Sequence, residues 1–401
     1  MPDSSEWVCC QLGAREHYAV PRALDRCGVL SELVTDFWFS PRSVLNSWSN
    51  GLADRFHPEL KEAKVRSANL SSVLFELTSR AKDLNGWQLI ARRNNWFQNF
   101  AASELARHAA NCDGAGPNVF AYSYAAVKIL KLAKERSWRT VLGQIDPGPA
   151  EERIVAQLHE DAGQDRLWEP APAQYWDDWR LECELADRIV VNSDWSRVAL
   201  ESEGVPATKI SVIPLAFEPD CEAISFKREY PEVFSSQRPL RVLFLGQINL
   251  RKGVRELLEA VKLLTGKPVE FWFVGPVQFA IPKPIESESC IQWFGPVPRR
   301  DVAKYYQTAD LFIFPTLSDG FGLTQLEAQS WKLPIIASSR CGSVVENGVN
   351  GLVLSEISGE SIAKTLLELL RSPESLQKMS NQSSVGEQFS LHSLSSALVN
   401  G

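Results

Sequence analysis

The chain has 401 residues, of which 44% are hydrophobic and 23% are charged, and its formal net charge is −7. This length exceeds that at which a single core usually keeps growing, so two domains are expected, and the composition is that of a globular protein. The acidic balance argues against a nucleic-acid partner, and no apolar run reaches the roughly 20 residues that span a bilayer.

The N-terminus reads MPDSSEWVCC and carries acidic residues where a secretory signal would carry basic ones, so a cytoplasmic protein is expected. The chain has 8 cysteines and 5 histidines, without CxxC pairs or the spacing of a metal site. We therefore expect no disulfide framework, no bound metal and no cofactor. Cys9 and Cys10 lie in a predicted buried strand, where cysteines usually act as small apolar packing residues.

Along the chain, short apolar runs alternate with segments of helical period, which predicts an α/β fold with parallel sheets wound through helices. One helix is predicted over 254–264, because apolar residues recur there at helical spacing. Strands are predicted near residues 7–12, 119–122, 140–145, 188–192, 210–214, 241–245, 270–274, 311–314 and 334–337.

The alternation fades in the polar, proline-containing stretch at 217–239 and restarts at Leu240, which predicts a domain boundary. The expected organisation is two Rossmann-like domains facing each other across a cleft. Residues 40–68 show little period and are interpreted as a loop or an insertion. The predicted parts are a first domain at 1–215, a linker at 216–239, a second domain at 240–385, and a C-terminal helix at 386–401 that packs back towards the first domain.

The most informative motif is GQINLRKG at 246–253, which follows the strand predicted at 241–245. A strand that leads through a glycine turn into a helix directs free backbone N–H groups at a ligand, and phosphate is the expected one. The spacing fits neither a dinucleotide turn nor a P-loop. Arg251 and Lys252 could instead be solvated surface charges. However, two cations at the positive end of a helix call for an anion, which a diphosphate would supply.

A second motif, DGFGLTQLE at 319–327, has two glycines that allow the backbone to approach a ligand closely. A helix is predicted to begin at about Leu323, which puts Glu327 one turn inside it. Its carboxylate could accept two hydrogen bonds from a vicinal diol such as a ribose. Alternatively, Thr324 and Glu327 have the offset of a capping box, and Asp319 could be a turn residue.

Two further loops carry weaker signals. In GPVPRRD at 295–301, backbone polar groups around Val297 at a strand end suit a nucleobase edge. In GSVVENGVNG at 342–351, Glu346 stands between two turns, and we interpret the segment as a helix start and a hairpin rather than as a catalytic site. Together with the two stronger motifs, these loops predict a site for a nucleoside diphosphate sugar.

Residues 246–260, 294–328 and 342–354, in this order and spacing, resemble the donor half of family 4 glycosyltransferases, which are retaining enzymes of the GT-B fold. Residues 186–200 and 209–219 resemble the end of the acceptor half. The resemblance covers about 186–354 well and is looser upstream, where residues 13–17 occupy the place of the glycine loop after the first strand. It makes 1–215 the acceptor-side domain and 240–385 the domain that binds the nucleotide sugar.

The resemblance implies that Lys252 binds phosphate, that Glu327 holds the ribose and that Asp319 contacts the transferred sugar. The positions assigned to donor binding are Gly13, Gly246, Gln247, Val297, Gly320, Phe321, Gly322, Leu323, Thr324 and Glu327. The positions assigned to catalysis are Asp319, Lys252, Arg251, His17 and Asp146.

The chain departs from the family pattern at these sites. Asp319 is one methylene shorter than the usual glutamate, and Gln247 stands where many members carry a phosphate-binding arginine, so Arg251 would supply that charge. The acceptor-side stretch LGQIDPGP at 142–149 lacks the histidine that many members have. Asp146 or Gln144 would stand in for it, or His17 would reach over from the first loop.

The expected reaction is transfer of a sugar, with retention, from a nucleoside diphosphate sugar to a saccharide or another hydroxyl acceptor, as in polysaccharide or glycan assembly. Arg251, Lys252 and the loop amides would stabilise the departing diphosphate, so a metal would be unnecessary. A nucleotide-sugar epimerase of the same architecture and a non-catalytic nucleotide-sugar-binding relative remain alternatives. Basic clusters at 61–66 and at Arg92 and Arg93 leave a peripheral membrane contact open, although such clusters are usually solvated faces.

Overall fold

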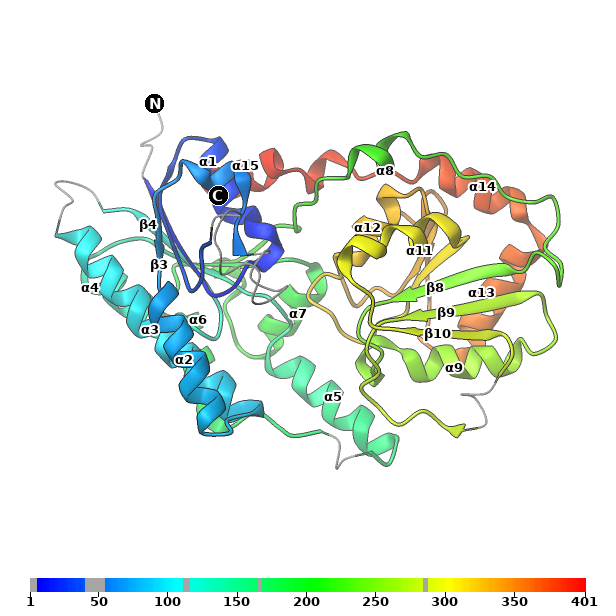
Figure 1. Cartoon of the computed structure of the whole chain (residues 1–401), viewed down its shortest axis with the longest axis horizontal. Coiled ribbons are helices and arrows are strands. Elements are labelled where there is room, and N and C mark those ends of the chain that lie inside the picture. The colour runs from blue at the N-terminus through cyan, green and yellow to red at the C-terminus, as the bar shows by residue number, and fades with distance from the viewer. Residues whose placement is uncertain (1–5, 40–54, 111–115, 165–167, 284–287) are drawn as a thin grey trace.

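Two separate parallel sheets organise the chain, as a computed structural model of residues 6–39, 55–110, 116–164, 168–283 and 288–401 shows (Figure 1). The strands are β1 (Trp7–Gln11), β2 (Leu30–Thr35), β3 (Val65–Ser67), β4 (Asn118–Tyr122), β5 (Thr140–Gly143), β6 (Arg188–Val191), β7 (Ile210–Val212), β8 (Leu240–Leu245), β9 (Val269–Val274), β10 (Ile291–Gly295), β11 (Leu311–Phe314), β12 (Ile335–Ala337) and β13 (Gly351–Val353). The helices are α1 (Ala19–Arg26), α2 (Asn69–Ala81), α3 (Gly86–Ala109), α4 (Val127–Glu135), α5 (Pro149–Asp161), α6 (Ala173–Leu185), α7 (Asp194–Ser202), α8 (Cys221–Ser225), α9 (Val254–Leu263), α11 (Ala303–Thr308), α12 (Thr324–Ser330), α13 (Gly359–Arg371), α14 (Pro373–Gln382) and α15 (Leu391–Asn400).

The first sheet has 7 strands in the order β3-β2-β1-β4-β5-β6-β7, and helices cover both of its faces. Neighbouring residues of β1 divide between two cores because side chains alternate along a strand. Val8 and Cys10 pack towards α3, α4 and α6, whereas Trp7 and Cys9 pack towards α1 and α15. The prediction that Cys9 and Cys10 are buried packing residues is confirmed, since each is only 1% exposed.

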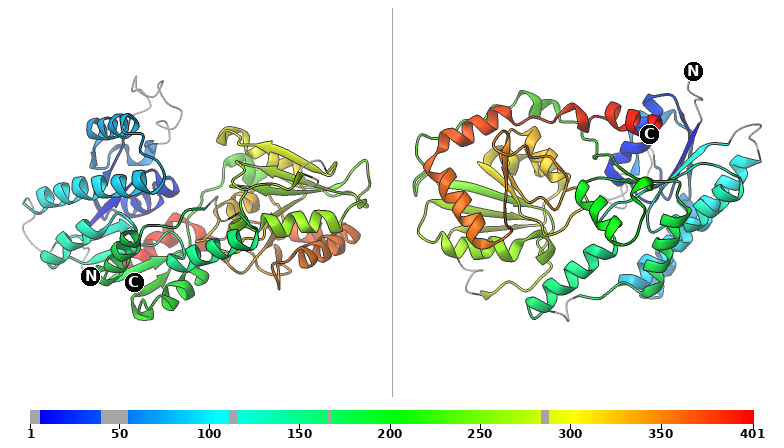
Figure 2. Two further views of the ribbon diagram at one scale, coloured as in Figure 1. Left: turned by 90° about the horizontal axis from the view of Figure 1, so that it is seen from below. Right: turned by 180° about the vertical axis from the view of Figure 1, so that it is seen from behind.

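The second sheet has 6 parallel strands in the order β10-β9-β8-β11-β12-β13. From β8 the chain adds strands towards one edge of the sheet, and from β11 it adds them towards the other edge, as in doubly wound folds. One face packs against α9 and α13, and the other packs against α11 and α12. The helix predicted over 254–264 is α9, whose apolar residues lie in the core. The fold prediction of two Rossmann-like α/β domains is confirmed, and Figure 2 shows the two sheets as distinct lobes.

All nine predicted strands are present, but the predicted ranges do not include β2, β3, β10 and β13. Of the predicted loop at 40–68, residues 40–54 lie outside the described part, and β3 extends the first sheet by pairing with β2. The interpretation of 342–351 as a helix start and a hairpin is wrong. Glu346 is exposed outside any helix, and Asn347 forms a parallel bridge to Gly351.

The chain passes between the domains twice, through segments that are themselves packed. On the way out, Phe234 is buried in the core of the second domain, and the buried Arg228 donates to backbone carbonyls of Tyr306, Gln307, Ala309 and Trp331. Where the two passages meet, Phe217 N donates to Phe389 O at 2.8 Å. None of the described helices has the length and apolar character needed to cross a bilayer.

After α14 the chain leaves the second domain, and the last helix, α15, packs against α1 of the first domain (Figure 1). Leu391, Leu394 and Leu398 lie in the core beneath it. Arg188 donates from Nη1 to Leu398 O at 3.0 Å and from Nη2 to Ala397 O at 2.9 Å. A guanidinium that binds the last carbonyls of a helix both satisfies them and complements the helix dipole.

Leu398→Ala is expected to lower the free energy of unfolding by about 2 to 5 kcal/mol, because it removes a fully buried side chain and leaves a cavity between α15 and α1. Urea denaturation followed by circular dichroism measures the change. His392→Ala, at an exposed position of the same helix, is the control and should change stability by no more than about 0.5 kcal/mol. Equal effects of the two substitutions would contradict this account of how α15 is held.

Candidate functional site

The two strongest sequence motifs meet at the carboxyl ends of β8 and β11, which are neighbours in the second sheet. A cavity of about 260 Å³ opens there. Ligand sites of open α/β sheets typically lie at such a reversal of strand order. The lining residues are Phe244, Leu245, Gly246, Gln247, Arg251, Lys252, Phe314, Asp319, Gly322, Leu323 and Thr324. We call this cavity the donor pocket.

Local backbone chemistry fixes Lys252 in the donor pocket. Asn249 begins the short turn before α9, and its Oδ1 accepts from Lys252 N at 3.1 Å. Gly253 follows with φ +72, and a Cβ at this position would overlap the Pro315 carbonyl oxygen. A glycine is therefore required for the turn to lie this close to the end of β11, where the Lys252 ammonium is 5.0 Å from the centre of the Phe314 ring.

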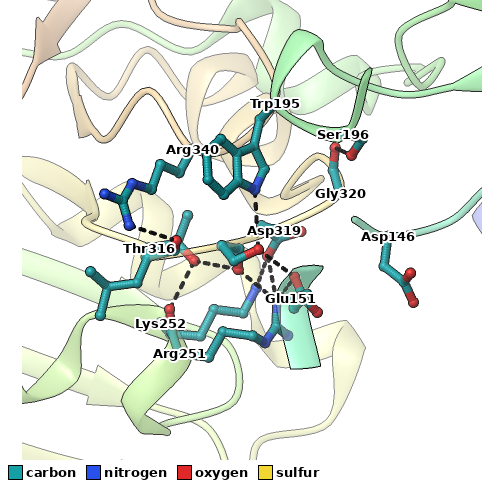
Figure 3. Close-up of polar contacts among 12 residues, drawn as sticks. Asp146, Glu151, Trp195, Ser196, Arg251, Lys252, Thr316, Asp319, Gly320 and Arg340 are labelled. Carbon is teal, nitrogen blue, oxygen red and sulfur yellow. Dashed lines mark hydrogen bonds and ion pairs between the residues drawn. The ribbon is translucent and has the colours of Figure 1, made fainter. Parts of the chain in front are cut away.

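The cations of the donor pocket are already paired with carboxylates (Figure 3). Lys252 Nζ forms an ion pair with Asp319 Oδ2, and Arg251 Nη1 lies 3.7 Å from the same oxygen. Arg251 Nη1 also lies 3.3 Å from Oε2 of Glu151, which comes from α5 of the first domain. Because Lys252 and Arg251 are only 14% and 21% exposed, the interpretation of them as solvated surface charges is wrong.

Burial and the neighbouring Arg251 lower the pKa of Lys252 to about 7. Burial raises the pKa of Glu151, and Arg251 opposes this effect. Desolvation disfavours the charged form of each group, so the cluster is poised to exchange its internal counter-ions for a bound anion. A phosphate near Lys252 would favour its protonated form.

The helix α12 begins at Thr324 and carries Glu327 one turn inside, as predicted. The Tyr306 hydroxyl donates to Glu327 Oε2 at 2.7 Å. The capping-box alternative is wrong, because Leu323 holds the N-cap position and makes no side-chain cap. The alternative interpretation of Asp319 as a turn residue agrees with the structure, since its Oδ1 accepts a hydrogen bond from Phe321 N at 3.1 Å. That amide is therefore engaged, and the Phe321 ring is buried.

The loop that carries Asp319 rests directly against the first domain. Trp195 Nε1 donates to Ser318 Oγ at 3.1 Å, and Ser318 Oγ donates to Glu151 Oε2 at 2.7 Å. At Gly320, a Cβ would overlap the Ile145 carbonyl oxygen and lie 3.2 Å from the Asp146 Cα. The sequence motifs gave no role to Trp195, Ser318 or Glu151. The only signal for Glu151 is its place just after Gly148-Pro149, which starts a helix beyond the end of β5.

Asp146 lines a separate cavity of about 130 Å³ in the first domain, beside Tyr122, Tyr124 and Tyr175. Its Oδ1 accepts from Gly148 N at 2.9 Å, from Gln144 Nε2 at 3.1 Å and from the Tyr124 hydroxyl. Among the described residues, no hydrogen bond uses Asp146 Oδ2. Gln144 is 1% exposed and also accepts from Trp179, so it holds Asp146 in position and does not face a substrate itself.

Seven predicted site residues lie outside the lining of the donor pocket, namely Gly13, His17, Asp146, Val297, Gly320, Phe321 and Glu327. Three of them, His17, Gly13 and Val297, lie further from it in the fold. His17 has left-handed backbone (φ 52), and its ring Nε2 lies 2.5 Å from Arg299 Nη1 of the second domain. Gly13 N donates to Asp36 Oδ1 at 3.0 Å, which engages that amide within the first domain. Val297 follows the edge strand β10, two strands away from β8 in the sheet. These contacts of His17 and Gly13, and the position of Val297 in the sheet, explain why the structure does not bring the three residues to Lys252.

With this geometry in view, residues 239–372 match the family described as Glycosyl transferases group 1. The second domain is a glycosyl transferases group 1 domain. The amylovoran biosynthesis glycosyltransferase AmsK of Erwinia amylovora is 26% identical over 181 residues, which are 41% of this chain and 43% of that protein. A D-inositol 3-phosphate glycosyltransferase of Thermobispora bispora is 26% identical over 222 residues, 49% of this chain and 51% of that one.

The whole chain also has a match among solved structures. Anabaena Alr3699/HepE in complex with UDP aligns with a TM-score of 0.61 at 14% identity, and the match covers 98% of each chain. At this identity the likeness concerns the fold alone. The resemblance to a GT-B glycosyltransferase is confirmed by the domain and the fold together. The chain spans about half the length of the curated relatives that it matches.

Glu151→Gln is expected to raise the affinity for inorganic pyrophosphate roughly 3- to 10-fold. The substitution removes a negative charge beside Arg251 but keeps an oxygen that can accept from Ser318. Isothermal titration calorimetry measures the dissociation constant. Glu160→Gln, at an exposed position of the same helix, is the matched control and should leave it unchanged. An unchanged or weaker affinity in Glu151→Gln would show that Glu151 does not compete with the anion.

Proposed function

We propose that this chain transfers a glycosyl group from a nucleoside diphosphate sugar to a hydroxyl acceptor at the interface of its two domains. The observation that carries the proposal is the convergence of Arg251, Lys252 and Asp319 in one pocket at the ends of β8 and β11. The group 1 domain supports it, as does the UDP bound by the Anabaena protein of the same fold. The relatives named above are glycosyltransferases, and nothing in the comparisons favours an epimerase.

In this proposal the diphosphate of the donor replaces Asp319 and Glu151 as the counter-ion of Lys252 and Arg251. Glu327 holds the ribose through its second carboxylate oxygen while it keeps the Tyr306 hydroxyl bond. Gly322, Leu323 and Thr324 line the pocket at the start of α12, where backbone N–H groups suit an anion. Asp319, once released from Lys252, is free to contact the transferred sugar.

We infer a retaining, metal-independent reaction. Negative charge develops on the diphosphate as the glycosidic bond breaks, and Arg251 and Lys252 stabilise this charge more in the transition state than in the ground state. The acceptor hydroxyl then attacks from the same face, with the departing phosphate as base. Asp146, whose Cα lies beside Gly320 and whose Oδ2 makes no hydrogen bond among the described residues, orients the acceptor. Closure of the domains excludes water that would hydrolyse the donor.

A saccharide acceptor in polysaccharide assembly is supported by the biosynthetic name of the Erwinia relative. We assign the reaction to the cytoplasm. The seven described cysteines are free thiols, and two of them, Cys27 and Cys221, are exposed, which suits a reducing compartment. A lipid surface remains a further partner to test. The basic cluster at 61–66 supports it poorly, because Lys64 and Arg66 both pair with Glu32.

Purified protein is expected to be stabilised by one or more nucleoside diphosphates in a thermal-shift panel and to release nucleoside diphosphate slowly from its matching sugar donor. Lys252→Ala should lower the release rate about 100- to 1,000-fold, because it removes a cation from the departing diphosphate. Glu327→Ala should mainly weaken donor binding. Glu327→Gln is its control, since it can keep the bond with the buried Tyr306 hydroxyl.

These measurements also separate the alternatives. An epimerase would convert the donor sugar without releasing nucleoside diphosphate. A non-catalytic relative would bind nucleotide but release nothing. Unchanged release in both Lys252→Ala and Glu327→Ala would refute the assignment of the donor pocket.

Binding of UDP is expected to take up a proton above neutral pH, because the pKa of Lys252 is lowered to about 7 in the free protein and a bound phosphate raises it. The affinity should therefore fall as pH rises from about 7.5 to 9, by up to about tenfold per unit. The terminal phosphate, whose pKa is near 6, is already ionised in this range. Calorimetry in two buffers with different ionisation enthalpies measures the uptake. Lys252→Arg should abolish it, and uptake that persists in this variant would exclude Lys252 as its source.

A further inference from the structure

A second cavity in the first domain, of about 310 Å³, lies between α3 and α6. It adjoins the cavity at Asp146, because Asn94, Tyr124 and Tyr175 line both. Asp146 in turn lies against Gly320 of the donor loop. The two cavities therefore form one path that leads from the domain interface outward along α3.

Aromatic rings form one wall of this path. Tyr124 and Tyr175 stack with centroids 4.8 Å apart and planes at 14°, and Trp87 meets Tyr175 edge-on at 4.9 Å. Trp87 is held by a bond from its Nε1 to Glu169 O at 3.0 Å. Trp87 and Tyr175 are both partly exposed, so these fixed rings present apolar surface to the cavity.

The polar groups of the cavity suit a ligand rich in hydroxyl groups. The Asn94 side chain and the Tyr175 hydroxyl, both at the cavity, make no hydrogen bond among the described residues. Asn95 accepts from Lys128 Nζ at 2.8 Å through Oδ1, which leaves its amide N–H groups as donors. Side-chain amides can both donate and accept, as sugar hydroxyls can.

The charges in the cavity are few and of opposite sign. Lys128 is engaged by the oxygens of Asn95 and Asn99, and Asp178 accepts from Gln174 at 2.9 Å. Lys128 and Asp178 are the charged side chains that line this cavity, so its lining carries no net charge, and neither Arg251 nor Lys252 contributes to it. Aromatic surface with amides and little net charge therefore favours a neutral carbohydrate.

We propose that the cavity between α3 and α6 is a binding subsite for an uncharged sugar residue of the acceptor. The proposal rests on the glycosyl-transfer function above and adds that the acceptor is a saccharide of at least two residues. Its reacting residue lies at Asp146, and the preceding ring packs on Tyr175 and Trp87. The path between the cavities fixes this order, since the cavity at Asp146 includes Ile145 and Asp146, which lie next to Gly320 of the donor loop.

Saturation-transfer NMR tests the subsite in the full chain, without donor. The probes are methyl α-D-glucopyranoside, methyl α-D-galactopyranoside and methyl α-D-mannopyranoside, with glycerol 3-phosphate as the charged comparison. At least one methyl glycoside should receive saturation, and glycerol 3-phosphate should receive none. Trp87→Ala and Asn94→Ala should each reduce the signal about fivefold or more. Asn94 has no partner to lose, so that variant remains informative if Trp87→Ala fails to fold.

Phe294→Ala, which removes a 39% exposed aromatic ring from the second domain, is the matched control and should leave the signal unchanged. Three results would overturn the subsite: no methyl glycoside binds, binding persists in both Trp87→Ala and Asn94→Ala, or only glycerol 3-phosphate binds. Thermal shifts with UDP on the same samples keep the two proposals apart. Stabilisation by UDP without glycoside binding removes the subsite alone, whereas loss of UDP binding in the unmodified chain removes the donor pocket.

Discussion

The rest of the site depends on two largely buried basic side chains held in place by carboxylates from both domains. Lys252 pairs with Asp319 in its own domain, and Arg251 lies between Asp319 and Glu151 of the other domain. Removing a charge from water is costly unless it is paired, so these partners hold the two basic side chains in place before any ligand arrives. The same pairing joins the domains, because a contact that neutralises Arg251 also brings α5 against the donor loop.

The parallel sheets make this arrangement possible. Every strand of the second sheet runs the same way, so loops from β8 and β11 emerge side by side although 67 residues separate Lys252 from Asp319. Two glycines then set the distances: Gly253 lets the β8 turn approach Pro315, and Gly320 lets the β11 loop approach Ile145. Larger side chains at either point would separate the groups that must meet.

The parts of the donor pocket that depend on neighbouring residues in the chain could be predicted from the sequence. The strand, glycine turn and helix around Lys252, and the place of Glu327 one turn inside α12, follow from short patterns. What was missed depends on distant partners. The strand β2 contains Glu32, whose charge interrupts the apolar pattern expected of a buried strand. In the fold this carboxylate is paired with Arg66 at 2.5 Å, Lys64 at 3.1 Å and His108 at 3.0 Å. Glu151 was missed for the same reason, since its partners Arg251 and Ser318 lie in the other domain.

The first domain contains a second buried carboxyl group that orders a loop beside a cavity. Tyr124 has left-handed backbone (φ 74), which is unfavourable for a tyrosine. Glu182 of α6 is fully buried and accepts from both Tyr124 N and Ala126 N at 2.7 Å, which satisfies the start of α4 and stabilises this turn. The turn directs the Tyr124 hydroxyl at Asp146 and its ring at Tyr175. One buried acid thus orders the turn from which Tyr124 contacts both Asp146 and Tyr175, so the carboxylate of Asp146 and the aromatic wall are positioned by the same element.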